Sequence, residues 1–488
     1  MSSSSRQMLK NSGIYGLGSI ANKIIGFVLL PIYTRYLTLA DYGVLSLVTI
    51  SVSIVTMIAN SGMASAMFRE VIYSEQDEST VASTTLYYLM GSSILLFGTG
   101  IIFSAELATV ILGDLSYKLL LQTVLMTGIF GTFNVVFNAH LRITGQAILY
   151  SIVSISSFVL GAALNIYFIV FLGQGLQGLV TAQLILAVLQ AIVSLIVLIP
   201  HLRLVFSLAL FRKMIKFGIA LIPGNIAALA LTSADRYLLN HYHGPSETGL
   251  YSIGYTVGMV VSLAVQAIQL AWPAQMFEIA KNETDSRHKF SLILTYYMAG
   301  IGSVALFVSV LARDVLMIMS APAFHKAYIV VPFIALSYVL YGMRFMTTIG
   351  VFTKGKTGSS SALVVVVAIF NLGLSVFLIP RYGMMGAAWA TLISYLLLAL
   401  ANLRLNIRLV HIPYEYGRLA KLAIAWGIIF GISMLLNMNS PYLSILLKLP
   451  LMMLFPILLL GMKWYSEHEL KKVKQILFQV KILKKMFG

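Results

Sequence analysis

Residues 165–185, NIYFIVFLGQGLQGLVTAQLI, resemble residues 371–393, NLGLSVFLIPRYGMMGAAWATLI, and the alignment matches Gly178 with Gly386 at a spacing of 208 residues. Further matches, at spacings of 206 and 209 residues, are Gly43 with Gly249 and Phe68 with Phe277. The chain therefore contains an internal repeat. Long apolar runs fill both copies, so the repeated unit is predicted to be a bundle of membrane helices.

Apolar runs of membrane-spanning length occupy most of the chain. Of its 488 residues, 59% are hydrophobic and only 10% are charged, whereas soluble domains carry about 25% charged residues. The runs lack the alternation of barrel strands, so they are predicted to be helices. Fourteen spans are expected, at about 13–33, 44–66, 84–104, 118–138, 148–171, 176–199, 217–238, 250–272, 291–311, 328–351, 361–379, 387–407, 419–437 and 442–462.

The repeat and the spans together predict the fold class. Matched positions are six spans apart, and because six is even, the two copies have the same orientation in the membrane. We expect an all-α polytopic membrane protein with about 14 transmembrane helices, in two six-helix lobes related by a pseudo-twofold axis, plus two C-terminal helices. The expected divisions are a first lobe at 1–199, an amphipathic linker helix at 200–216, a second lobe at 217–410, spans thirteen and fourteen at 411–463, and a basic amphipathic tail at 464–488.

The distribution of basic residues predicts the orientation. If the N-terminus is cytoplasmic, 24 of the 33 Lys and Arg residues lie on the cytoplasmic side, six lie on the other side, and three fall within spans. This bias favours cytoplasmic N- and C-termini. The linker and the tail, both basic and amphipathic, are expected to bind anionic membrane lipids. Because the net charge of +17 follows the membrane sides, nucleic acid is not an expected partner.

The sequence lacks the residues and motifs that disulfides, metal sites and nucleotide-binding sites require. The chain has no cysteine, which excludes disulfides and thiolate metal sites. It also lacks the HExxH, GxxxxGK[ST] and dinucleotide-binding patterns, so neither a metal site nor a cofactor nor direct ATP coupling is expected. No loop between spans is long enough to hold a separate catalytic site. The chain is therefore predicted not to be an enzyme.

Three segments carry a family resemblance: PIYTRYLTLADYGVLSL at 31–47, KFGIALIPGNIAALALTSADRYLLN at 216–240 with ETGLYSIGY at 247–255, and IPRYGMMGAAWATLISY at 379–395. They resemble the Wzx-like oligosaccharide flippases, the polysaccharide-export branch of the multidrug/oligosaccharidyl-lipid/polysaccharide (MOP) flippase superfamily. Asp235-Arg236-Tyr237, followed by Gly249-Leu250-Tyr251, is the most specific part.

The resemblance implies two lobes around a cationic cavity in the bacterial cytoplasmic (inner) membrane. The implied function is alternating-access transfer of an undecaprenyl-diphosphate-linked oligosaccharide from the cytoplasmic to the outer leaflet. Such transport serves the assembly of O-antigen, capsule or another surface polysaccharide, with a polysaccharide polymerase and chain-length machinery as candidate partners. Two alternatives remain, a peptidoglycan-precursor lipid flippase and a multidrug and toxin extrusion (MATE) cation antiporter. A cation antiporter should have carboxylates in its cavity, whereas the ionisable residues within these spans are mostly basic.

Ionisable residues within spans are candidates for the transport site because they are costly in a membrane. Lys23, Arg344 and Arg236 are the candidates for binding the diphosphate headgroup, since lysine and arginine are the main ligands of phosphate. Asp235 is a candidate proton or sodium coupling site, with structural pairing across the lobes as the alternative. Arg69, Arg142 and Lys354 are candidates for a cytoplasmic entrance, although topology alone also places basic residues there.

Overall fold

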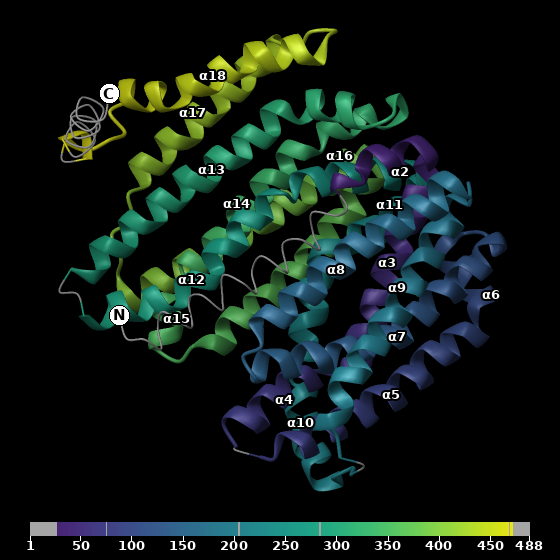
Figure 1. The fold of residues 1–488 in the computed structure, drawn as a ribbon. Coiled ribbons are helices and arrows are strands. Elements are labelled where there is room, and N and C mark those ends of the chain that lie inside the picture. Colours follow the sequence, from purple (N-terminus) through teal and green to yellow (C-terminus); the bar gives the residue numbers. More distant parts are fainter. Residues whose placement is uncertain (1–26, 75, 204, 283–284, 468, 472–488) are drawn as a thin grey trace, which may run out of the picture.

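The computed structural model is a bundle of long helices (Figure 1). It describes residues 27–74, 76–203, 205–282, 285–467 and 469–471. Every element within these ranges is a helix, and none is a strand. This agrees with the predicted all-α class. An apolar chain can satisfy its backbone polar groups in lipid by helical hydrogen bonds within each segment.

The first half of the chain forms one group of helices, drawn in purple to blue in Figure 1. Its elements are α2 (Leu30–Tyr36), α3 (Leu39–Asn60), α4 (Met63–Ile72), α5 (Glu78–Ile102), α6 (Ser104–Leu107), η1 (Ala108–Leu112), η2 (Leu115–Tyr117), α7 (Lys118–Ile143), α8 (Ala147–Ile166), η3 (Tyr167–Phe171), α9 (Gly175–Leu198) and η4 (Ile199–His201). A capping box fixes the start of α3, because Thr38 Oγ1 accepts from the Asp41 amide at 3.2 Å and Asp41 accepts from the Thr38 amide at 2.9 Å.

The second half forms a second group, drawn in teal to green, with two final helices in yellow along its edge beside α13 (Figure 1). Its elements are α10 (Leu208–Ile219), α11 (Ile222–Gly258), α12 (Val261–Asn282), α13 (Ser286–Met319), η5 (Pro322–Ile329), α14 (Val331–Met346), α15 (Ile349–Thr353), α16 (Thr357–Val410), α17 (Tyr416–Leu435) and α18 (Pro441–Gly461). Both α11 and α16 contain two helices, which meet at Gly244 (φ 81°) and at Gly383 (φ 54°).

Ten helices are long and apolar enough to cross a membrane, or eleven if the bent pair α10 and α11 forms one span; only the described residues are counted. The number fourteen therefore remains a prediction, and three features of the chain explain the difference. The first predicted span, 13–33, lies mostly outside the described residues. The eighth is divided between α11 and α12, and the eleventh and twelfth are the two arms of α16.

Matched glycines show the internal repeat in the backbone. Gly145 and Gly355 have positive φ angles of 70° and 63°, at the turns that follow α7 and α15. Gly173 and Gly383 form a second pair, with φ angles of 63° and 54°. Each pair is separated by the same 210 residues. Only glycine adopts this conformation readily, so the same turn recurs at equivalent places in both halves.

The segment between the two lobes differs from the expected lipid-facing helix. Its helix, α10, begins at Leu208, and its buried residues Leu210 and Met214 belong to a cluster with Met63 and Met67 of α4. The apolar face of α10 thus packs on the first lobe. The preceding segment is held by the amides of Arg203 and Ser207, which donate to hydroxyls of α5, those of Ser83 (2.8 Å) and Thr84 (3.3 Å).

Candidate substrate-translocation site

The two lobes meet at a close crossing of α3 with the second arm of α11. A Cβ atom added to Gly43 would lie 2.0 Å from the backbone oxygen of Pro245, and one added to Gly249 would lie 2.0 Å from that of Leu39. No side chain can occupy either position without separating the helices. Small residues allow such close approach between membrane helices.

Further contacts join the lobes around this crossing. Ser51 Oγ and the Tyr237 hydroxyl are 2.8 Å apart, and the backbone amide of Ala321 donates to Thr34 Oγ1 at 3.3 Å. Apolar side chains of both lobes form one buried cluster there, in which the rings of Tyr42 and Phe324 contact edge to face at 5.8 Å. The lobes are therefore sealed together at the end of the bundle where α3 begins.

Away from this end, the corresponding helices of the two halves, α4 and α12, pack against different neighbours. Beyond the kink at Ser61–Gly62, α4 packs against α5, α7 and α10, whereas α12 packs against α13 and α14 (Figure 1). Thus α4 stays with the first lobe, on which the linker helix α10 also packs, and α12 stays with the second lobe. The chain also approaches itself closely at the far end of α3, where a Cβ added to Gly218 of α10 would lie 2.1 Å from the backbone oxygen of Ser61, so tight contacts occur at both ends of α3.

The candidate coupling residue Asp235 lies inside the second lobe and is 2% exposed. Its carboxylate is 3.1 Å from the guanidinium of the adjacent Arg236, accepts a short hydrogen bond from the Tyr251 hydroxyl, and lies 3.4 Å from Thr391 Oγ1. All of these partners belong to α11 and α16. The structural pairing of Asp235 is therefore within one lobe and not between lobes.

The candidate headgroup residue Arg236 is also engaged within the second lobe. Besides Asp235, its guanidinium donates to the Thr232 carbonyl oxygen at 2.8 Å and lies 4.1 Å from the centre of the Tyr255 ring. The side chain is buried and has a counter-charge. It has little capacity left for a diphosphate, and this geometry favours a role in holding Asp235 and α11.

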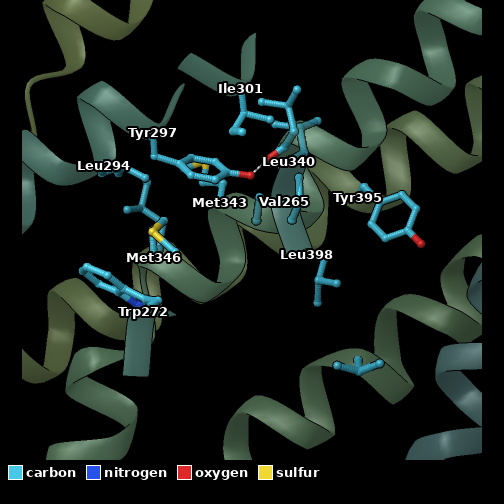
Figure 2. Close-up of a cluster of buried hydrophobic side chains, with 14 of the residues drawn as sticks. Val265, Trp272, Leu294, Tyr297, Ile301, Leu340, Met343, Met346, Tyr395 and Leu398 are labelled. Atoms are coloured by element: carbon cyan, nitrogen blue, oxygen red, sulfur yellow. Dashed lines mark hydrogen bonds between the residues drawn. The ribbon is translucent and has the colours of Figure 1, made fainter. Parts of the chain in front are cut away.

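A series of tyrosines extends from Arg236 towards Arg344. The hydroxyls of Tyr255 and Tyr338 are 3.1 Å apart, and the ring of Tyr395 lies 6.5 Å from that of Tyr338 and 5.6 Å from that of Tyr341. In Figure 2, Tyr395 stands at the edge of a buried apolar cluster, and its hydroxyl points away from the other labelled side chains. The cluster fixes α14 through Leu340, Met343 and Met346.

Arg344 differs from Arg236 because no counter-charge pairs with it among the described residues. Its Nε is buried without a hydrogen-bond partner, and no ion pair to its guanidinium occurs within the described residues. Among the described residues, the aromatic ring that lies near its guanidinium is that of Phe345, whose centre is 5.6 Å from Arg344 Cζ. An unpaired guanidinium in a membrane helix is costly. The sequence-predicted anion site is thus best represented, among the described residues, by Arg344.

The remaining sequence-predicted site residues do not gather around Arg344. Arg69 and Arg142 are exposed and lie over Phe217 (4.7 Å) and Phe68 (4.9 Å) at the α4 end of the first lobe. Lys354 is exposed at the end of α15. Lys23 lies outside the described residues.

Sequence reasoning missed a second charged pair in the membrane. Lys448 of α18 donates to Asp314 of α13 at 2.6 Å and to Asn437 at 2.7 Å, and both charged residues are fully buried. Lys448 is one of the six basic residues counted above on the non-cytoplasmic side, and the structure instead buries it within α18. The signal was available, because the predicted span 442–462 already contains Lys448. The pair fastens the two final helices to the second lobe.

Comparisons with known proteins identify the group to which this architecture belongs. A sequence family described as "Polysaccharide biosynthesis protein" matches residues 8–273, which is more than half of the chain. The chain belongs to the polysaccharide biosynthesis protein family. A relative of this chain, an uncharacterized membrane protein of Haemophilus influenzae, is 24% identical over 300 residues, which cover 59% of this chain and 70% of the relative.

Solved structures of other proteins share the fold of this chain. It is similar to the lipid II flippase MurJ in an inward closed conformation, with a TM-score of 0.67 and 15% identity over 91% of this chain and 99% of that one. It is also similar to an inward-facing MATE multidrug-resistance transporter of the MOP superfamily, with a TM-score of 0.63 and 15% identity over 80% of this chain and 95% of that one.

The family match confirms the predicted resemblance to proteins of polysaccharide biosynthesis, and the chain has the fold that the resemblance implies, shared with MurJ and with the MATE transporter. The protein is a multi-pass membrane protein, with ten or eleven helices among the described residues long and apolar enough to cross a membrane.

Proposed function

We propose that the protein transfers an undecaprenyl-diphosphate-linked oligosaccharide from the cytoplasmic to the outer leaflet of the bacterial cytoplasmic membrane by alternating access. The single observation that carries this choice of cargo is the unpaired guanidinium of Arg344. A diphosphate is a concentrated anion, and arginine can bind two of its oxygens at once. The match to a polysaccharide biosynthesis family supports a sugar-bearing lipid.

The seal between the lobes supports the alternating-access part of the proposal. The basic residues favour cytoplasmic termini, which would place the Gly43–Gly249 crossing at the outer face. The described conformation would then be closed to the outside at this crossing, and a second close contact, between Gly218 and the backbone oxygen of Ser61, would lie towards the cytoplasm. Reopening requires separation of α3 from α11, which breaks the contact between Ser51 and Tyr237.

Asp235 is the proposed coupling site for H⁺ or Na⁺. Protonation of this carboxylate, or binding of a cation to it, would weaken its hold on Arg236 and on the Tyr251 hydroxyl. Both arms of α11 carry these groups, so the change would act on the helix that forms the lobe crossing. The same tyrosine series leads from Arg236 towards Arg344, which would link ion binding to the cargo site.

The product would enter surface polysaccharide assembly, with the polymerase and chain-length machinery as downstream partners. A peptidoglycan-precursor flippase is the second candidate, because the fold similarity to the lipid II flippase MurJ is high and lipid II also presents a diphosphate. An organic-cation antiporter is less compatible with Arg344, since a cation and an unpaired guanidinium repel each other.

Reconstituted proteoliposomes test the proposal. Fluorescent undecaprenyl-diphosphate oligosaccharide, lipid II and an organic cation are offered separately, each with and without a proton or sodium gradient. Movement of the oligosaccharide lipid supports the proposal. If only lipid II or only the cation is transferred, the proposed cargo is wrong and that compound is the cargo, while the fold assignment is unaffected.

A further inference from the structure

A hollow of about 580 Å³ lies between α4 and the end of α10 and plays no part in the site around Arg344. Its lining includes Phe68, Arg69, Tyr73, Ser74 and Phe217. It lies beyond the end of α3, and the 22 residues of that helix extend for about 33 Å at a rise of roughly 1.5 Å per residue. The hollow is therefore near the membrane face opposite the Gly43–Gly249 crossing.

Arg69 presents a positive charge to this hollow. Its Cζ atom lies over the Phe217 ring, 4.7 Å from the ring centre, and the side chain is exposed. Within the described residues, no carboxylate forms an ion pair with it. A guanidinium attracted to a ring face still has N–H groups that can donate to the oxygens of an anion.

The other charges around the hollow leave a net positive site. Lys213 donates to Ser74 Oγ at 3.3 Å but forms an ion pair with Glu70, so these two charges cancel. Glu70 is 1% exposed and does not reach Arg69 as an ion pair. Arg142 lies 4.9 Å from the ring of Phe68, which lines the hollow. Two arginines thus remain without a described counter-charge.

The internal repeat shows that this arrangement is not a requirement of the fold. The repeat that relates Phe68 to Phe277 relates Arg69 to Glu278, and Phe277 packs at 6.2 Å against Phe352 and not against an arginine. A preference for basic residues at the cytoplasmic face would act on both halves alike. The pair of arginines is specific to the first lobe.

We propose that this hollow is an entry subsite for the phosphate-bearing head of a polyprenyl diphosphate lipid, occupied before the head reaches Arg344. Arg69 binds the phosphate oxygens, and the 87% exposed ring of Tyr73 at the rim offers a face for the adjoining sugar. The inference rests on the proposed function for the identity of the lipid. The inference that the hollow binds a phosphate group rests only on Arg69 and Arg142.

Binding to the full-length protein in neutral phosphatidylcholine nanodiscs tests the subsite. The probe is fluorescent undecaprenyl diphosphate, and the competitors are phosphatidylglycerol and inorganic diphosphate. Arg69→Ala is expected to raise the Kd of the probe at least tenfold, and Arg69→Lys to raise it less. Arg212→Ala is the matched control, because Arg212 is an exposed arginine of α10 outside the lining; its Kd should equal that of the wild type.

Equal Kd values for Arg69→Ala, Arg212→Ala and the wild type would overturn the subsite. Displacement of the probe by equimolar phosphatidylglycerol, to the same extent as by unlabelled undecaprenyl diphosphate, would also overturn it, because the hollow would then bind any anionic lipid. Inorganic diphosphate should compete only at much higher concentration; equal competition would show a site for free phosphate and contradict the proposal. Transport by the wild type, measured in parallel, tests the proposed function separately from these binding results.

Discussion

Gly43 of α3 and Gly249 of α11 face each other across the two lobes, and a Cβ on either would lie 2.0 Å from a backbone oxygen of the opposite helix. The same two glycines are equivalent positions of the internal repeat, 206 residues apart. Residues that correspond in the two halves and also meet in space must lie close to the axis that relates the halves. The lobe crossing is therefore at the pseudo-twofold axis.

Gly249→Val is expected to prevent closure at this crossing, because the added side chain would collide with the backbone of α3. Transport should fall at least tenfold, while a thiol placed at Ser51 should become more accessible to a membrane-impermeant reagent added from outside. The chain has no native cysteine, so the label would be specific. Gly131→Val is the control, because no atom lies within 4 Å of the Cβ position of Gly131. If Gly131→Val lowers transport as much as Gly249→Val does, the loss cannot be assigned to closure at the Gly43–Gly249 crossing.

Arg344→Ala is expected to lower oligosaccharide-lipid transport at least tenfold without reducing the amount of protein in the membrane, because it removes the unpaired guanidinium. Arg344→Lys should retain part of the activity as a point charge. Exposed Arg404 of α16 provides the control Arg404→Ala. Lys23→Ala is predicted to behave like Arg344→Ala. Normal export by both variants at wild-type protein levels would contradict the headgroup assignment.

Asp235→Asn is expected to abolish the response of transport to an ion gradient, because amide nitrogen cannot take up a proton or replace the carboxylate charge. The substitution also leaves Arg236 buried without its counter-charge, and a broken buried pair costs about 3–5 kcal/mol. Asp235→Asn with Arg236→Gln removes both charges and should recover stability without recovering gradient dependence. A stable double variant that still responds to the gradient would leave Asp235 with a structural role only.

Lys448→Met is expected to destabilise the protein by about 3–5 kcal/mol, because it leaves Asp314 charged, buried and unpaired. Asp314→Leu combined with Lys448→Met should restore much of that loss, since an apolar pair suits the membrane interior. Thermal unfolding of the purified variants measures both effects. If Lys448→Met unfolds at the wild-type temperature, the pair does not fasten α18 to α13.

The sequence predicted the helical class and the two-lobe repeat because both depend on local composition and on spacing along the chain. The transport site was harder. The sequence showed that Asp235 and Arg236 are charged and within a span, but their partners Tyr251 and Thr391 come from elsewhere in the second lobe. Adjacent residues on a helix point about 100° apart, and only the side-chain conformations bring these two together. The hollow beside Arg69 depends on α10 packing on α4, which no pattern in the sequence indicates.

The transfer of fluorescent undecaprenyl-diphosphate oligosaccharide across proteoliposomes, compared between the wild type, Arg344→Ala and Arg404→Ala, is the most direct test of the central claim. The account predicts transfer by the wild type and by Arg404→Ala, and a loss of at least tenfold with Arg344→Ala. Transfer of the lipid at equal rates by all three proteins, or by none of them while an organic cation crosses, would contradict it.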